Sequence, residues 1–302
     1  MSMRLSLKRT AMAAGALALA VGMSGCGSDD TATPETSGAA VPTAAKDDAL
    51  AAMVPAEFAD DGVLTIGTDA SYAPGQFLDA DGKTIIGFDV DLAKAVAQVL
   101  GLEAEMQNAP FDSLVEGVKT GKYELGASSF TINAERQQQV DMVSYFSAGT
   151  SWAVAKGNPM QITPDTACGM KVAVQKATVQ VDDVEARSEK CGGEGTEKIT
   201  IEQFQLQSDA TAAVVSGKDD AMLADSPVVA YAITKTGDKL ELVGEISDAA
   251  PYGYAVPKAQ GDYTEAVRGA VQKLMDDGTY KEILAVWGVE DGAITTSEVN
   301  PA

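Results

Sequence analysis

Short runs of β-branched and apolar residues alternate with longer segments of helical periodicity along most of this chain. The run VLTIGT at 63–68 predicts a strand. Apolar residues at helical spacing predict a helix over 90–100, which ends at Gly101. Strands that alternate with helices in this way are typical of βαβ units and a mainly parallel sheet, so the sequence predicts an α/β fold.

The alternation falls into two similar sets. The expected strands are 63–68, 103–107, 124–128, 151–155, 171–174, 199–204, 221–223 and 252–257, and the expected helices are 90–100, 112–120, 179–188, 210–216, one from about 227, 263–275 and 280–287. We expect one lobe from each set, with the chain crossing near Lys156 and returning near Tyr252. The first lobe then comprises 60–155 plus 252–302, the second comprises 156–251, and two strands connect them as a hinge.

The two sets place polar residues at corresponding positions. Ser129 follows Gly121 and a predicted strand, and Asp225 follows Gly217 and another strand at the same distance. Ligands bind at the carboxyl ends of strands in open parallel sheets, so both residues are candidates for a ligand site. The alternative is a chance similarity, because helix–glycine–strand turns are common.

The N-terminus indicates export. Met1–Arg9 is basic, residues 11–23 are apolar but too short for a permanent transmembrane helix, and Met23-Ser24-Gly25-Cys26 follows. This arrangement resembles the lipobox of bacterial lipoproteins and predicts a signal peptide over 1–26 with a lipid on Cys26. Two acyl chains there suffice for stable membrane anchoring. The alternative is an ordinary signal peptide with an incidental cysteine.

The segment 27–59 is rich in Ser, Thr, Ala and Pro, so we expect a flexible tether there. The two cysteines beyond it, Cys168 and Cys191, form an even pair in an oxidising compartment, which favours a disulfide. A metal site is the weaker alternative, because the chain has no histidine.

The chain contains 44 acidic residues against 22 basic ones, a net charge of −22. This charge argues against nucleic acid or an anionic membrane surface as a partner. No sequence pattern indicates a cofactor or a metal, and the missing histidine excludes a Ser–His–Asp triad.

Four segments resemble the family 3 extracellular solute-binding proteins, the receptors of polar amino acid ABC importers. They are GTDASYAP at 67–74, GFDVDL at 87–92, SSFTINAER at 128–136 and DDGTY at 276–280. The resemblance extends from about Val63 to Trp287. It implies a two-lobed, type II periplasmic-binding-protein-like fold, a free amino acid as ligand and hinge closure around it. It also implies ABC permease and ATPase partners, a monomer, and an extracytoplasmic location on the cell membrane through the lipid anchor alone.

The resemblance also implies roles for individual residues. Arg136 would bind the ligand carboxylate, Asp225 would accept from the ammonium, and the helping residues would be Ser128, Ser129, Thr131 and Thr178. An arginine fork suits a carboxylate, and a buried zwitterion needs partners for both charges. The structural alternatives are a surface charge at Arg136, a helix cap at Asp225 and a plain strand end at the serines. Asp89 and Asp91 stand at a helix start, and we interpret them as structural.

The side-chain pocket follows from the same resemblance. Tyr72 and Phe111 match positions that enclose the ligand side chain, while Asp69 and Gln175 would meet its polar end. Lys176 and Gly75 depart from the family pattern, and Gly75 is expected to widen the pocket mouth. These residues favour glutamine, asparagine or a basic amino acid over an acidic one. The alternative functions are a dehydratase-like enzyme on the same fold and an amino acid sensor module.

Overall fold

Two long strands, β7 (Asp141–Ala155) and β11 (Leu240–Val256), run antiparallel through the middle of an eight-stranded sheet. The strand order is β5-β1-β6-β11-β7-β10-β8-β9, so each long strand has three further strands on its outer side. The computed structural model describes residues 42–193 and 195–301, which belong to one compact unit.

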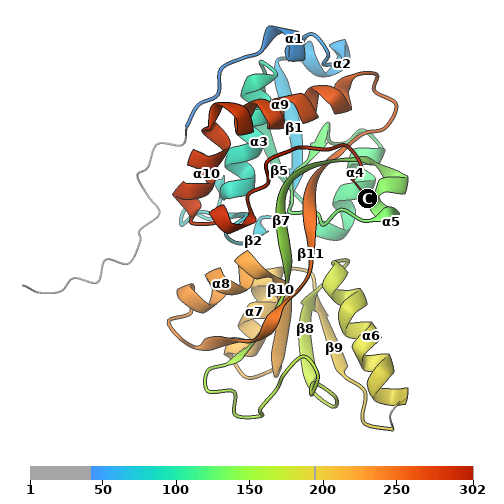
Figure 1. The fold of residues 1–302 in the computed structure, drawn as a ribbon, viewed down its shortest axis with the longest axis vertical. Coiled ribbons are helices and arrows are strands. Elements are labelled where there is room, and N and C mark those ends of the chain that lie inside the picture. The colour runs from blue at the N-terminus through green and yellow to red at the C-terminus, as the bar shows by residue number, and fades with distance from the viewer. Residues whose placement is uncertain (1–41, 194, 302) are drawn as a thin grey trace, which may run out of the picture. The chain divides into compact units, whose positions relative to one another are not determined.

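One end of the sheet carries the first lobe. We define it by the parallel strands β1 (Val63–Thr68), β5 (Glu103–Asn108) and β6 (Leu125–Gly126) with the helices around them (Figure 1). These helices are α3 (Phe88–Val99), α4 (Phe111–Lys119), α5 (Ala134–Gln139), α9 (Tyr263–Asp277) and α10 (Thr279–Trp287). A small antiparallel sheet of β2 (Ser71–Tyr72), β3 (Gln76–Leu78) and β4 (Ile85–Ile86) lies between β1 and α3 in the chain.

The other end of the sheet carries the second lobe, defined by the strands β8 (Lys171–Gln175), β9 (Thr200–Phe204) and β10 (Ala221–Asp225) and three helices. The helices are α6 (Val179–Gly193), α7 (Gln207–Val215) and α8 (Ser226–Lys235). β8 pairs parallel with β9 and β10, and β10 pairs antiparallel with β7. In Figure 1, β7 and β11 are the strands that connect the two lobes.

Each lobe has apolar clusters of its own. In the first lobe, the apolar residues of α3, α9 and α10 pack on β1 around Leu64 and Ile66, which are fully buried. In the second lobe, Val172 and Val174 of β8 pack with Leu223 and α6. The predicted α/β fold with a mainly parallel sheet flanked by helices is therefore confirmed.

The two connecting strands are much longer than the predicted strands 151–155 and 252–257. β7 has 15 residues and β11 has 17. Glycine and proline made the sequence look interrupted, for example at Gly149 and Pro251. The ladder between β7 and β11 continues through both positions. Pro251 pairs in register with Ser147, and Gly149 lies at a register shift, where a bulge inserts residues into a ladder that continues on both sides.

The N-terminal part of the described chain packs on the first lobe. The short helices α1 (Asp48–Ala51) and α2 (Ala56–Ala59) precede β1, and Val54 between them is buried in the first-lobe core. The Asp47 amide donates to the carbonyl of Val99 at 2.8 Å. The tether predicted over 27–59 is therefore wrong for residues 42–59, because a few apolar residues suffice to fix them. Residues 27–41, and the predicted signal peptide with Cys26, lie outside the described residues.

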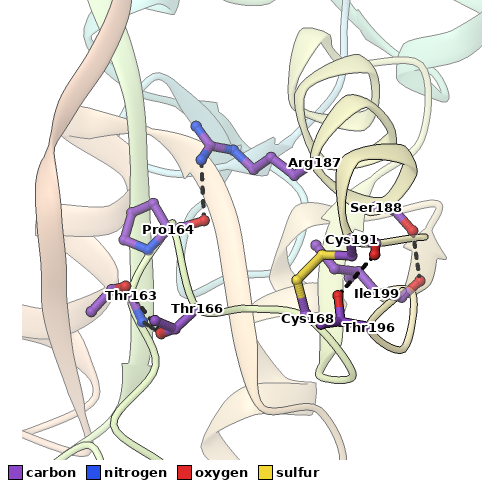
Figure 2. Close-up of a disulfide and its surroundings, with 9 residues drawn as sticks. All are labelled: Thr163, Pro164, Thr166, Cys168, Arg187, Ser188, Cys191, Thr196 and Ile199. Atoms are coloured by element: carbon purple, nitrogen blue, oxygen red, sulfur yellow. Dashed lines mark hydrogen bonds between the residues drawn. A yellow bond between two sulfur atoms is a disulfide. The ribbon is translucent and has the colours of Figure 1, made fainter. Parts of the chain in front are cut away.

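The disulfide between Cys168 and Cys191 is present, as predicted. It joins the segment before β8 to the last turns of α6 (Figure 2). Next to it, the Thr196 hydroxyl donates to the carbonyl of Cys191 at 2.8 Å, and the Ser188 hydroxyl donates to the carbonyl of Ile199 at 3.2 Å. The bond therefore fixes the end of α6 against the strands of the second lobe.

Reducing this bond is expected to lower the free energy of unfolding by about 3 kcal/mol, because it closes a loop whose ends are 23 residues apart. The measurement is urea unfolding with and without a reductant. A Cys168→Ser/Cys191→Ser variant serves as the control that a reductant should not affect. Freely labelled thiols in the native, unreduced protein would show that the bond is absent.

Candidate ligand-binding site

A cavity of about 10 Å³ lies between the two lobes. This is about the space that one water molecule requires. All the predicted ligand-binding side chains except Asp69 line it, together with two residues that were not predicted. The lining residues are Tyr72, Phe111, Ser128, Ser129, Thr131, Arg136, Gln175, Thr178, Val179, Gln180 and Asp225. Residues from five separate stretches of the sequence thus meet at one place, as the family resemblance implied.

Arg136 lies in α5, and its side chain turns inward, with the residue only 8% exposed. Asn133 caps the helix by accepting from the Arg136 amide at 2.9 Å. The guanidinium donates to the carbonyl of Thr131 at 2.7 Å and, across the lobes, to the carbonyl of Ala177 at 3.2 Å. It also lies over the Phe111 ring, 5.4 Å from its centre. The alternative of a solvated surface charge is therefore wrong.

No carboxylate lies within 4.0 Å of the Arg136 guanidinium among residues 42–193 and 195–301. Burial lowers its pKa, while the more distant Asp225 opposes this effect. An arginine nevertheless stays protonated in proteins. A buried cation held by carbonyl dipoles and aromatic rings is costly, and an anion placed against it would offset this cost.

Asp225 ends β10 in the second lobe and is 5% exposed. One carboxylate oxygen accepts from the hydroxyls of Tyr72 at 2.9 Å and Tyr252 at 2.7 Å. The other oxygen accepts from the Gln180 amide at 2.8 Å. Asp225 is the N-terminal boundary of α8, but its side chain makes no capping hydrogen bond, so a helix cap does not explain the acid at this position.

The partners of Asp225 are all neutral. Burial raises the pKa of this carboxyl, while the hydrogen bonds from Tyr252, Tyr72 and Gln180 oppose the rise. These three donors orient the carboxylate without neutralising its charge. A cation that enters the cavity therefore meets an oriented acceptor.

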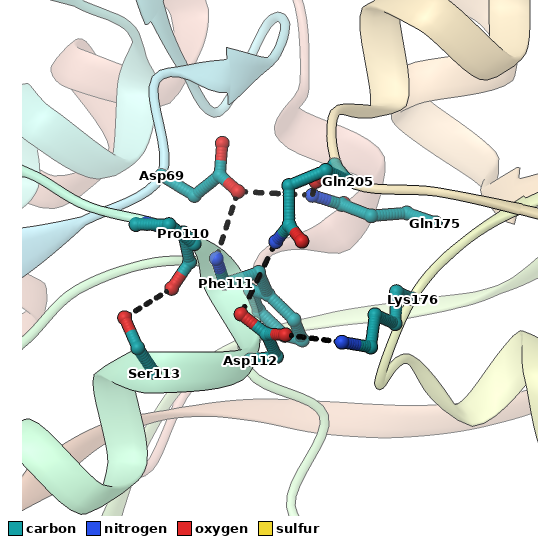
Figure 3. A network of polar contacts seen from close by, with 8 residues as sticks. All are labelled: Asp69, Pro110, Phe111, Asp112, Ser113, Gln175, Lys176 and Gln205. Carbon is teal, nitrogen blue, oxygen red and sulfur yellow. Dashed lines mark hydrogen bonds and ion pairs between the residues drawn. The ribbon is translucent and has the colours of Figure 1, made fainter.

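Asp69 follows β1 and lies beside the cavity rather than in its wall. It accepts from the Phe111 amide and from the Gln175 side chain, each at 3.0 Å (Figure 3). Burial raises its pKa, against the opposing effect of these hydrogen bonds and of Ser71. Asp69 and Gln175 are thus brought together, as predicted, and no basic group is paired with Asp69 in the described parts of the chain.

Lys176 points away from the cavity. Its ammonium pairs with Asp112 at 2.8 Å, and the Gln205 amide donates to the same carboxylate at 3.1 Å (Figure 3). The Lys176 side chain is 52% exposed, so this pair between the lobes contributes little to stability. Asp112 partly offsets the positive charge of Lys176, which does not line the cavity.

Gly75 does not widen the pocket mouth. A side chain there would bring a Cβ within 2.8 Å of the Ser129 hydroxyl and 3.2 Å of the Tyr72 carbonyl. The expectation is wrong because the loop at residues 128–131, called the ligand loop below, fills the space next to Gly75. Glycine at this position permits the close approach of Ser129.

The remaining predicted residues hold the cavity wall in place. The amide of Ser129 donates to Asp89 at 2.7 Å, and the hydroxyl of Ser128 accepts from the Asp69 amide at 3.0 Å. Thr178 donates to the carbonyl of Gln175 at 2.8 Å at the start of α6. Thr131 forms an isolated β-bridge with Tyr252, which places its carbonyl next to Arg136.

Sequence reasoning missed Gln180, Tyr252 and Asp89. Gln180 lies two residues after Thr178, so the position next to a predicted ligand residue could have indicated it. Tyr252 was counted only as part of a strand. Asp89 was interpreted as a helix-start acid, but it makes no capping bond and instead accepts from Ser129. Asp91 does have a structural partner, because it accepts from the Trp287 indole at 2.9 Å.

Comparisons with known proteins agree with this geometry. The family model of the bacterial extracellular solute-binding proteins, family 3, matches residues 64–290. The arginine-binding protein ArgT of Corynebacterium glutamicum is 41% identical over 252 residues, which cover 83% of this chain and 82% of that protein. The ABC transporter glutamine-binding protein GlnH of Bacillus subtilis is 28% identical over 213 residues, which cover 69% and 75%.

A solved structure gives the same picture. An ancestral arginine-binding protein bound to arginine superposes with a TM-score of 0.69 at 33% identity, and the match covers 75% of this chain and 98% of that one. The two-lobed type II fold is therefore confirmed.

Proposed function

Because this chain belongs to the bacterial extracellular solute-binding proteins of family 3, we propose that it captures a free amino acid between its lobes and delivers it to an ABC permease. The relatives named above are binding proteins and not enzymes, so the dehydratase-like alternative is set aside. The sensor alternative would require an output module. We also propose, as predicted, that the protein is a monomer and that an ATPase subunit acts with the permease.

The observation that carries this proposal is a pair of opposite buried charges, neither of which has an ion-pair partner in residues 42–193 and 195–301. Arg136 in the first lobe is held by carbonyl groups, and Asp225 in the second lobe is held by hydroxyl and amide groups. The carboxylate and ammonium of one α-amino acid would neutralise both. Because the two residues belong to different lobes, such a ligand stabilises the closed arrangement.

Ligand entry requires the lobes to separate. The cavity of about 10 Å³ is too small for an amino acid, and direct bonds between the lobes close it. These bonds join Tyr72 to Asp225 and Asp69 to Gln175. We infer that the strands β7 and β11 act as the hinge, with the domain boundaries at 60–155 plus 252–302 and 156–251. The ligand would then replace bonds that the two lobes make with each other.

A basic amino acid, with arginine first, is the ligand that the site favours. Asp69 is a buried acid whose partners are all neutral, which suits a cationic side-chain end. A second cavity, of about 240 Å³, is lined by Arg136 and by the acidic residues Asp112, Glu116, Glu135 and Asp182. Asp112 and Glu116 are paired with lysines, which leaves Glu135 and Asp182 as the acids there that attract an approaching cation. The relative at 41% identity is named an arginine-binding protein.

We further propose that the protein is a lipoprotein, anchored through Cys26 outside the cytoplasmic membrane. The family is extracellular, and no helix within residues 42–193 and 195–301 is long and apolar enough to cross a membrane. The sequence Met23-Ser24-Gly25-Cys26 supports the lipid attachment.

Replacing the modified cysteine tests the anchor. Cys26→Ser is expected to abolish incorporation of labelled palmitate in growing cells and to move the protein from the membrane fraction to the soluble fraction. Cys168→Ser is the matched control that should keep the label. A Cys26→Ser variant that still takes up palmitate would contradict the anchor.

Arg136→Ala tests the ligand site. The protein is unfolded and refolded to remove carried-over ligand, and the free amino acids are compared by thermal shift and then by calorimetry. Loss of the partner of a buried carboxylate is expected to cost about 2–5 kcal/mol of binding, which is more than tenfold in affinity. Arg268→Ala is the control, because Arg268 is bound to Glu265 on the outside of α9.

The outcomes are distinct. Weaker binding in Arg136→Ala but not in Arg268→Ala supports the proposed contact between Arg136 and the ligand carboxylate. Equal affinity in wild type and Arg136→Ala would remove Arg136 from the site. No shift of the wild type with any amino acid would refute amino acid binding altogether.

A further inference from the structure

Asp89, the second residue of α3, is fully buried and bonded to the ligand loop. One of its carboxylate oxygens accepts from the Ser129 amide at 2.7 Å and lies 3.3 Å from the Ser129 hydroxyl. The hydrogen bonds of the Asp89 carboxylate go to Ser129 and not to the amides of its own helix. Its position at a helix start therefore does not account for its contacts, which are directed at Ser129 in the cavity wall.

The bonds continue from Ser129 to the other groups of the site. The Ser129 hydroxyl also lies 3.1 Å from the amide oxygen of Gln76, whose nitrogen donates to the Ser128 hydroxyl at 3.3 Å. That hydroxyl accepts from the Asp69 amide at 3.0 Å. Asp89 is thus one end of a buried polar chain that ends at Asp69. All its members belong to the first lobe, so the chain does not require closure.

Ser129 is held in a conformation that it would not prefer. Its φ of 51° lies in the left-handed region, which is uncommon for residues other than glycine. Such a conformation persists only where surrounding groups fix it. In this structure, Asp89 fixes the conformation of Ser129 through two contacts, and Gly75 packs closely against it.

We propose that Asp89 is a positioning residue whose ionised carboxylate holds Ser129 in the ligand-binding conformation, so that protonation of Asp89 weakens amino acid binding. This inference rests on the function proposed above. The hydroxyl hydrogen of Ser129 is directed at Asp89 or Gln76. The loop geometry, rather than a direct contact of Asp89 with ligand, transmits the effect.

Burial sets the pKa at which Asp89 titrates. The titratable groups that face it are the hydroxyls of Tyr145 on β7 and Tyr254 on β11, whose own pKa values are raised well above the ordinary value. Burial raises the pKa of Asp89 to about 6, and the nearby Tyr145 hydroxyl and the Ser129 groups oppose the rise. No basic side chain is among the groups that shift it.

The direction of the effect follows from these bonds. Above the pKa of about 6 the carboxylate is charged, and charge-assisted hydrogen bonds are roughly twice as strong as neutral ones. Ligand affinity should therefore fall as pH falls through this value. Stability should change in the opposite sense, because a buried acid with a raised pKa destabilises the folded state once it ionises.

Because affinity and stability should change in opposite directions with pH, measuring both distinguishes a positioning role of Asp89 from a structural one. Asp89→Asn keeps the shape and an acceptor oxygen but removes the charge. We expect it to raise the melting temperature at pH 7.5 and to weaken amino acid binding there by about tenfold. At pH 5 its affinity should equal that of the wild type. Asp91→Asn, two residues further along α3 and bonded to Trp287, should leave the pH dependence of affinity unchanged.

Calorimetric titration with arginine at several pH values measures this difference, and amide exchange of the loop 128–131 in the ligand-free protein measures the loop directly. Faster exchange in Asp89→Asn, with a flattened affinity profile, supports the proposal. Parallel affinity profiles of wild type and Asp89→Asn, or unchanged exchange, would overturn it. A wild type that binds no amino acid would refute the proposed function and the ligand effect, while the exchange data still decide whether Asp89 holds Ser129.

Discussion

A buried arginine that has no carboxylate partner in the described part of the chain is the constraint on which the rest of the site depends. The Arg136 guanidinium is fixed by two carbonyl groups and by aromatic rings, and none of these cancels its charge. A fold tolerates such a group only if another contribution offsets the cost. We propose that a ligand carboxylate supplies this contribution, so that the binding energy comes largely from a charge that has no ion-pair partner in the described part of the chain.

We propose that the fold couples the pairing of this charge with a ligand to a movement of the two lobes. Arg136 and Asp225 come from lobes that are joined by β7 and β11, and a zwitterion contacts both only when the lobes approach. Tyr72 in the first lobe and Gln180 in the second already orient Asp225. We propose that the neutral bonds across the cavity keep the closed arrangement accessible and that the ligand charges stabilise it further.

Sequence reasoning predicted much of this, for identifiable reasons. β1 was predicted with its observed bounds, because a β-branched run between turn residues has one plausible structure. Arg136, Asp225 and their neighbours were indicated by family motifs. The lengths of β7 and β11 were missed, because bulges that carry glycine and proline through a strand leave no local signal. The partner of Asp89 was missed for a different reason: Ser129 is distant in sequence and meets it only after folding.

The measurement that tests the central claim most directly compares two ligands that differ only at the carboxylate. Arginine and agmatine, its decarboxylated form, share the amine and the guanidinium, so calorimetric titration of the refolded protein isolates the contact with Arg136. The account predicts that arginine binds and that agmatine binds at least about a hundredfold more weakly, since it leaves the buried cation unpaired. Equal affinity for the two ligands would contradict it.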